Sequence, residues 1–188
     1  MRWTRMRWLV LGALLALAVS AQAALAQPSG ARKAQAANLA KPAPVKVTGI
    51  KVLEFGVYAS TVQSREKSSA VADGVKDRAR DFKLVRKSTL VDAGLGTGIG
   101  MAYVVRGAPK GARVELEVAV RHPEMVHPDT RETMTRSAAA FERTIGETGH
   151  AVWSFDTPAG LVPGEYVIEL IYEGRVLAKK EFRVTVRK

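Results

Sequence analysis

The feature that most constrains this sequence is a regular alternation of apolar and charged residues in its C-terminal half. Between residues 113 and 121, valine and leucine alternate with mostly charged residues, and residues 165–173 repeat the scheme with three glutamates on one face. A period of two is typical of a strand in a sheet that has one face in water. A short turn, Glu173-Gly174-Arg175, leads into residues 176–187, which alternate again, so the two segments predict an antiparallel hairpin.

Four further segments have a β-type pattern, and turn-forming residues separate them. They are residues 47–58, 82–91, 99–106 and 150–156. In the first of these, the apolar residues change parity, which predicts a bulge or a switch between sheets near Leu53. The pattern therefore gives about seven strands.

Two polar stretches without periodicity, residues 62–80 and 122–149, are expected to be long loops, with at most one helical turn from Ser137 to Arg143. These loops or a sheet edge are the expected interaction surface, because loops on a rigid sandwich often carry function. The chain shows no long amphipathic helix after its N-terminal region, so a parallel α/β fold is not expected. Short antiparallel strands in a chain of this size predict an all-β fold, an immunoglobulin-like antiparallel β-sandwich of about seven strands.

The N-terminus has the pattern of a signal peptide. Arg2, Arg5 and Arg7 precede an apolar run, residues 8–19, that is shorter than the roughly 20 residues needed to cross a bilayer. Small-residue cleavage patterns end at Ala23 and at Ala26, and we expect a Sec-type signal peptide over residues 1–26 with cleavage after Ala26 or Ala23. This pattern predicts a periplasmic or secreted bacterial protein.

Composition separates the mature chain into two parts. Residues 27–44 are rich in alanine, proline and glutamine and predict a flexible linker, so the folded domain is expected over residues 45–188. The 188-residue chain is 47% apolar and contains no cysteine, which allows a hydrophobic core and excludes disulfides, thiolate metal sites and thiol catalysis. Its formal net charge is +11, three units of which come from the signal peptide.

One turn carries a motif of its own. Pro163 and Gly164 precede Tyr166 in a pattern that resembles the tyrosine corner of immunoglobulin-like domains, where a tyrosine hydroxyl bonds back to the turn before a strand. The alternative is that Tyr166 is a half-buried core aromatic. Trp153 shares a strand face with Phe155, and we expect that face to lie on the core.

Several of these segments taken together resemble a known family. They are EFGVY (54–58), the glycine-rich run before IGMAYVV (99–105), the RHP step (121–123) and LVPGEYVIELIYEGRVLAKKEFRV (161–184). The similarity spans most of residues 47–187 and is to secreted bacterial domains of unknown function with an immunoglobulin-like sandwich. The resemblance implies that fold and supplies no catalytic residue.

The segment HPEMVHPD is the one place where metal-ligating residue types gather in the sequence. His122, Glu124, His127 and Asp129 could converge on zinc or copper if this segment were a loop. The spacing matches no recognised metal motif, and Pro123 and Pro128 explain the segment as a rigid strand exit. We therefore assign no metal site, and these four residues are kept as candidate metal ligands.

Other reactive patterns are incomplete. The glycine-rich run 94–100 lacks the spacing of a dinucleotide-binding fingerprint and the Lys-Ser/Thr pair of a P-loop, and is expected instead to allow close backbone approach. Serine, histidine and aspartate are present, but no G-x-S-x-G elbow occurs. Of the aromatic residues, Tyr58 and Phe141 are expected to be exposed, too few for a sugar-binding platform.

Basic residues cluster around the second expected strand and at the C-terminus. Lys83, Arg86, Arg183 and Arg187 are the candidates for binding an anionic ligand, although acidic residues interrupt both groups. The expected function is a non-enzymatic binding or structural module without a cofactor, acting in the periplasm or envelope on an envelope protein or an anionic polymer and not on nucleic acid. Two alternatives stay open: a metal-binding protein or small metal-assisted hydrolase using His122 and His127, and an electrostatic binder of anionic envelope polymers.

Overall fold

The computed structural model describes residues 44–186, and within them the chain forms strands and turns with no helix. The strands are β1 (Lys46–Lys67), β2 (Val75–Arg86), β3 (Leu90–Ala93), β4 (Thr97–Ala108), β5 (Arg113–Val126), β6 (Thr133–Thr144), β7 (Thr148–Phe155), β8 (Gly164–Tyr172) and β9 (Arg175–Val186). Residues 44–186 therefore contain no helix long and apolar enough to span a membrane. The expected signal peptide and nearly all of the expected linker lie outside the described residues.

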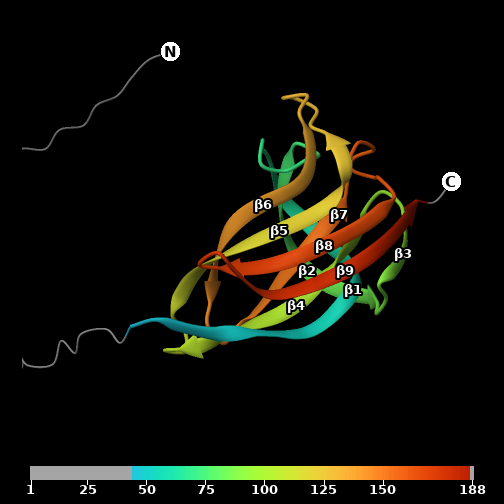
Figure 1. Ribbon diagram of the computed structural model, residues 1–188. Coiled ribbons are helices and arrows are strands. Elements are labelled where there is room, and N and C mark those ends of the chain that lie inside the picture. The colour runs from blue at the N-terminus through green and yellow to red at the C-terminus, as the bar shows by residue number, and fades with distance from the viewer. Residues whose placement is uncertain (1–43, 187–188) are drawn as a thin grey trace, which may run out of the picture. The chain divides into compact units, whose positions relative to one another are not determined.

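Two sheets form a sandwich (Figure 1). One has the strand order β2-β1-β4-β7 and the other β3-β9-β8-β5-β6. All neighbouring strands are antiparallel except β3, which runs parallel to β9. The all-β immunoglobulin-like sandwich expected from the sequence is confirmed, with nine strands in the described part of the chain in place of about seven.

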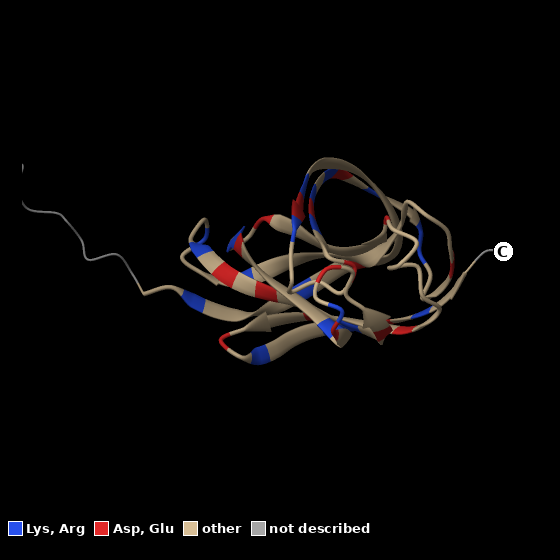
Figure 2. Ribbon diagram, turned by 90° about the horizontal axis from the view of Figure 1, so that it is seen from above, with Lys and Arg blue, Asp and Glu red and all other residues tan. Residues whose placement is uncertain are grey.

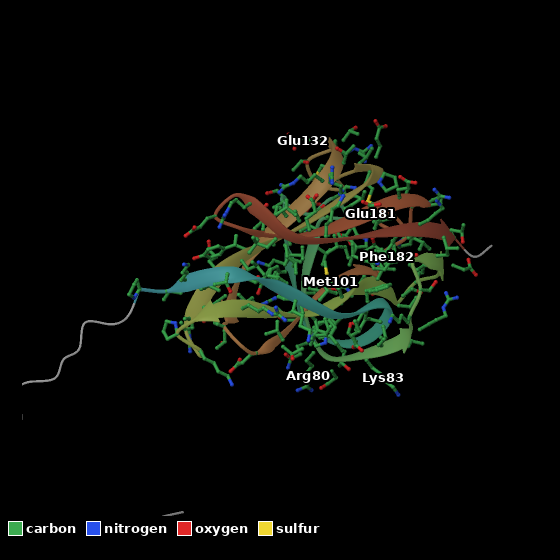
Figure 3. The ribbon with its side chains drawn as sticks, turned by 60° about the horizontal axis from the view of Figure 1, so that its bottom comes forward. Arg80, Lys83, Met101, Glu132, Glu181 and Phe182 are labelled. Carbon is green, nitrogen blue, oxygen red and sulfur yellow. The ribbon has the colours of Figure 1, made fainter. Side chains whose placement is uncertain are left out.

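The core lies between the sheets and follows from the alternation of the strands. Leu116 on β5 and Ile168 and Leu170 on β8 are completely buried, and their sequence neighbours are more exposed. Met101 on β4 is also completely buried, within a strand that is buried over most of its length. Figure 3 shows Met101 and Phe182 between the two layers. Each buried aliphatic side chain of this size contributes about 1.5–3 kcal/mol of hydrophobic free energy, so this face of each sheet specifies the fold.

The tyrosine corner is formed. Tyr166 is completely buried, and its hydroxyl donates a 2.7 Å hydrogen bond to the carbonyl oxygen of Val162 in the turn before β8. Gly164 in this turn has a φ of 143° and lies so close to Pro123 that a Cβ atom would be 2.5 Å from the proline Cγ. Trp153 packs beside Tyr166, with 6.3 Å between ring centroids, so the turn is fixed to the core.

The two expected loops are mostly strands, so this prediction is wrong. Residues 62–80 continue β1 to Lys67 and begin β2 at Val75, whereas residues 122–149 contain the end of β5, all of β6 and the start of β7. The helical turn expected from Ser137 to Arg143 is part of β6. Its alanines favour a helix locally, but the antiparallel ladder with β5 decides the conformation.

Two smaller expectations about strands have opposite outcomes. The bulge near Leu53 is confirmed, because the β1–β4 register shifts between Val52 and Glu54. Residues 82–91 are not one strand: β2 ends at Arg86 and β3 begins at Leu90.

The β1–β2 hairpin extends beyond the rest of its sheet. The last pair between β1 and β4 is Tyr58 with Gly98, and from residue 59 onward β1 pairs only with β2. We call residues 59–83 the hairpin arm. Near the tip of the arm, Ala70 accepts a 3.1 Å hydrogen bond from the backbone N–H of Ala138 on β6 in the opposite sheet. The arm therefore connects the two sheets at one end of the sandwich.

Candidate functional site: the cleft beneath the hairpin arm

A cavity of about 790 Å³ lies between the hairpin arm, β6 and β7. Strands β6 and β7 are edge strands, each at one side of its own sheet. The cavity lies where these two strand edges face each other, and residues 137–144 and 147–154 line much of it. Its volume is within the roughly 300–1,000 Å³ that is usual for ligand sites. We call it the cleft.

Small side chains on β6 help to explain why this space is not filled. Ala138, Ala139 and Ala140 follow one another on β6 and line the cleft, and Ala79 of the arm lines it as well. Phe82 of the arm covers β7 by stacking on the imidazole ring of His150, with 4.7 Å between ring centroids. The arm thus spans the cleft, and the alanines beneath it leave room.

The edges of both strands present backbone polar groups to the cleft. On β6, the N–H of Ala138 points away from β5 towards the arm, and backbone alternation gives Ala140 and Glu142 the same orientation. On β7, the carbonyl oxygen of Phe155 accepts a hydrogen bond from the backbone N–H of Gly96, so the backbone groups of Phe155 point towards β4. Because backbone groups alternate along a strand, those of Val152, three residues earlier, point to the opposite edge. Such edges accept a further strand unless the protein blocks them.

An acidic group lies at one end of the cleft. Asp77 receives two 2.9 Å hydrogen bonds from Arg65, and Arg65 also lies 3.7 Å from a carboxylate oxygen of Asp156. Burial of Asp156, its hydrogen bond with Asp77 and the negative charge of Asp77 raise the pKa of Asp156 above its usual value. Burial also raises the pKa of Asp73 in the same part of the cleft. One arginine thus shares its charge among three acidic side chains.

A basic group surrounds Phe141 on β6. The ammonium group of Lys76 lies 4.8 Å from the centroid of the Phe141 ring, and the guanidinium carbon of Arg143 lies 4.9 Å from the same centroid. Arg143 also donates a 2.9 Å hydrogen bond from Nε to the hydroxyl of the completely buried Tyr103. Within residues 44–186, neither Lys76 nor Arg143 forms an ion pair with a carboxylate.

A buried serine–histidine pair attaches the arm to the sandwich. His122 Nδ1 lies 2.8 Å from the carbonyl oxygen of Pro123, which can only accept, so Nδ1 carries the proton and Nε2 accepts the hydroxyl proton of Ser137 at 3.0 Å. The Ser137 oxygen in turn accepts the backbone N–H of Ala72 at 2.8 Å. Burial lowers the pKa of His122, which favours this neutral form. The serine hydroxyl is engaged on both sides and acts as a clasp.

Trp153 contributes one unpaired polar atom beside this clasp. Its indole ring stacks on His122 at 5.4 Å between centroids, the residue is 7% exposed, and it lines the cleft. The indole Nε1 has no hydrogen-bond partner among the described residues. A buried donor of this kind favours a ligand that brings an acceptor.

The metal candidates are not brought together. Both ring nitrogens of His127 are used inside the protein, Nε2 with the carbonyl of Ser68 at 3.1 Å and Nδ1 with the backbone N–H groups of residues 129 and 130. Asp129 pairs with Lys67 at 3.1 Å, Glu124 is exposed, and His122 belongs to the serine clasp. In the part of the chain that the structure describes, no group of three or more potential ligands could hold a metal ion.

The anionic-ligand candidates are also dispersed. Arg183 on β9 pairs with Glu165 at 3.0 Å, whereas Lys83 and Arg86 are exposed on β2 in the other sheet. Arg187 lies outside the described residues. Figure 3 shows Lys83 on the opposite side of the molecule from Glu181 of β9, and Figure 2 shows basic and acidic residues interleaved along the ribbons.

Two other sequence expectations have clear outcomes. The close backbone approach expected for the glycine-rich run is confirmed at Gly100, where a Cβ atom would be 2.3 Å from the carbonyl oxygen of Ala151. Tyr58 was expected to be exposed and is only 2% exposed, because it packs against His150 and its hydroxyl donates to Glu54. Burial and the charge of Glu54 raise the pKa of Tyr58 to about 12.

Sequence comparison identifies the family. Residues 46–184 match the family described as Domain of unknown function (DUF3859), and the chain belongs to it. No curated protein matches the sequence. An immunoglobulin-like protein from Pseudomonas aeruginosa is similar in structure, with a TM-score of 0.51 and 25% identity over 76% of this chain and 98% of that one.

A second structural match is to the Pseudomonas fluorescens alkylpurine DNA glycosylase AlkC bound to DNA containing an abasic site analog. It has a TM-score of 0.34 and 18% identity, and covers 51% of this chain and 27% of that one. A likeness at that level is too distant to bear on fold or function. The immunoglobulin-like neighbour agrees with the fold, and neither it nor the family description names a ligand.

Proposed function

We propose that this member of the DUF3859 family is an exported, non-enzymatic binding module of the bacterial envelope, and that its ligand binds in the cleft beneath the hairpin arm. The observation that carries the proposal is the cleft itself, a cavity of about 790 Å³ between two terminal strands. Ligand sites are usually concave, with a few polar groups among apolar ones.

The cleft is lined by the segments in which the sequence suggested an interaction surface. Residues 62–80 and 122–149 were expected to bind as loops, and parts of both segments line the cleft as strands and turns. The rigid sandwich holds them in place through the serine clasp and the core. A pre-formed site of this kind loses little conformational entropy on binding.

A non-enzymatic role is favoured by how the reactive side chains are used. Ser137 and His122 have the arrangement of a nucleophile and its base, but the serine hydroxyl accepts the Ala72 N–H and is only 3% exposed. His122 and His127 do not meet at one site, so their geometry gives no support to a metal-assisted hydrolase. The interleaved surface charges likewise favour a specific cleft over general adhesion to anionic polymers.

In-cell photocrosslinking tests the site. The full-length chain would carry a photoreactive phenylalanine analogue in place of Phe141 in the cleft or, as a matched control, in place of Val176, which is 51% exposed on β9. We expect a discrete adduct from position 141 and none from position 176. Equal adducts from both positions, or adducts from 176 alone, would contradict the proposal.

Export is tested separately by fractionation and N-terminal sequencing. The three N-terminal arginines and the apolar run that follows them support a cleaved signal peptide. We expect mature protein in the periplasmic fraction that begins at Gln27 or Ala24. An intact Met1 in the cytoplasmic fraction would contradict the export part of the proposal.

A further inference from the structure

We infer that the cleft binds the C-terminal end of an extended polypeptide, which pairs with the free edge of β7 while its terminal carboxylate binds between Lys76 and Arg143. This inference rests on the proposed function and specifies the chemistry of its ligand. Three features of the described residues support it: the strand edges, the uncompensated cations and the closed end of the cleft.

The strand edges require a ligand that has its own backbone donors and acceptors. Val152 on β7 and Ala140 on β6 direct their N–H and C=O groups towards the cleft, and neither strand has a partner strand there. An extended peptide satisfies such groups in a regular pattern, as in β-strand addition. The unpaired indole Nε1 of Trp153 provides one more donor for a peptide carbonyl.

The two cations near Phe141, Arg143 and Lys76, indicate which end of the peptide lies at this part of the cleft. Arg143 is held by neutral groups alone: the Tyr103 hydroxyl, the Glu142 carbonyl oxygen at 2.9 Å and the ring of Phe141. The adjacent carboxylate of Glu142 is used by Arg113 at 3.0 Å. Arg143 is therefore positioned without a counter-charge, and an arginine in this state suits a carboxylate.

Lys76 comes to the same place from the arm. Its ammonium group and the Arg143 guanidinium lie 4.8 Å and 4.9 Å from one ring centroid, so the two cations cannot be more than about twice that distance apart. A carboxylate between them would receive charge-assisted hydrogen bonds from two residues of different strands. Lys76 therefore makes the site depend on the arm being closed over the cleft.

The shape of the cleft explains why the carboxylate is a terminal one. Strands β6 and β7 are joined by only residues 145–147, so their edges converge just beyond Arg143. A peptide that runs antiparallel to β7 reaches this convergence with its C-terminus and cannot continue. From Ser137 to Arg143 the strand advances about 20 Å, which is room for roughly six extended residues.

Peptide selection on the mature chain tests the inference. Two short random-peptide libraries would be displayed on one carrier, the first ending in a free carboxylate and the second followed by further carrier sequence. We expect enriched peptides from the first library only. For a selected peptide, replacing the terminal carboxylate with a carboxamide should weaken binding on the order of tenfold or more, as measured by fluorescence anisotropy.

Matched variants assign the effect to the cleft. Lys76→Gln should weaken binding of the carboxylate peptide and leave the carboxamide peptide nearly unchanged, whereas Lys83→Gln, the same charge change on the arm outside the cleft, should affect neither. Ala139→Trp places a large ring on the face of β6 that lies beside Val118 in the cleft, and it should abolish binding of both peptides. Circular dichroism and thermal unfolding would show that each variant keeps the wild-type fold.

The two proposals fail in different ways. The carboxylate inference would be overturned, with the cleft kept as the site, by peptides that fail to bind Ala139→Trp but are enriched equally from both libraries. Peptides that fail to bind Ala139→Trp but bind equally well as carboxylate and carboxamide would overturn it in the same way. Peptides that bind Ala139→Trp as well as wild type would place binding elsewhere and overturn the proposed function. If neither library is enriched and an anionic polysaccharide binds wild type but not Ala139→Trp, the peptide is overturned as the ligand.

Discussion

The core of the sandwich and the cleft beneath the arm are built from different kinds of residue. In the core, large side chains such as Leu116, Ile168 and Tyr166 are completely buried and alternate with outward-facing neighbours. The cleft is lined by consecutive alanines of β6 and by charged residues of the arm, and β6 and β7 have no further partner strand at its edges. This difference predicts that the core supplies most of the stability and that the cleft contributes little to it.

A pair of truncations tests this comparison most strongly. Leu116→Ala removes a completely buried side chain and should lower the free energy of unfolding by about 2–5 kcal/mol. Phe141→Ala removes a half-buried ring from the cleft and should cost less than about 2 kcal/mol. Urea unfolding of both variants measures the difference, and equal losses would show that the cleft is part of the stabilising core.

The serine clasp is the next test, because it joins the two regions. Ser137→Ala leaves the Ala72 N–H and the His122 Nε2 without their partner, which should cost about 1–3 kcal/mol. Hydrogen exchange in residues 68–74 should also become faster. Thr135→Ala, an exposed change on the same strand, is the control, and an equally large effect there would exclude a specific role for the clasp.

The clasp also makes stability depend on pH. Burial lowers the pKa of His122, so below about pH 6.5 the unfolded chain binds a proton that the folded chain does not. The stability should therefore be constant above this pH and fall as the pH decreases towards the lower folded pKa. His150, whose pKa burial also lowers, changes stability in the same direction.

Denaturant titrations between pH 7.5 and pH 5.5 measure this dependence. His122→Gln should reduce the slope, whatever its effect on stability at pH 7.5, and the remaining slope should belong mainly to His150. The raised pKa values of Asp73 and Asp156 act in the opposite direction, so the difference between wild type and His122→Gln is what isolates the histidine. An unchanged slope in His122→Gln would contradict the assignment of the neutral form.

Surface ion pairs should have the smallest effect. Arg183 and Glu165 are paired at 3.0 Å with side chains that are 68% and 75% exposed, and such pairs contribute about 0–1 kcal/mol. Arg183→Gln should therefore change the unfolding midpoint only slightly and leave peptide binding unchanged. A large loss of peptide binding in Arg183→Gln would instead support an anionic-ligand site on β9.

The sequence predicted the parts of the fold that rely on local alternation. Residues 113–121, 165–173 and 176–186 show their strand period directly, and they were found in β5, β8 and β9, each with an apolar face on the core. Strand β6 was missed because the run from Ser137 to Ala140 is small and shows no alternation of apolar and charged residues. The distal part of β1 was missed because it is exposed on both faces.

The site depends on contacts between residues far apart in the sequence. Phe141 was singled out as an aromatic free to be exposed, but its partner Lys76 meets it only because the arm folds across the end of the sandwich. No local motif marks such a meeting. Conversely, the histidines of HPEMVHPD gather in the sequence and separate in space, because β5 continues as a strand through His122 to Val126.

Residue-resolved amide hydrogen exchange, with and without a selected C-terminal peptide, tests the central claim most directly. In the free protein, the amides of Val152 and Ala140 should exchange quickly, while that of Trp153, which faces β4, should be protected. Bound peptide should slow exchange at Val152 and Ala140 and leave β9 unchanged. Edge amides that are already protected in the free protein, or new protection confined to other strands, would contradict the account.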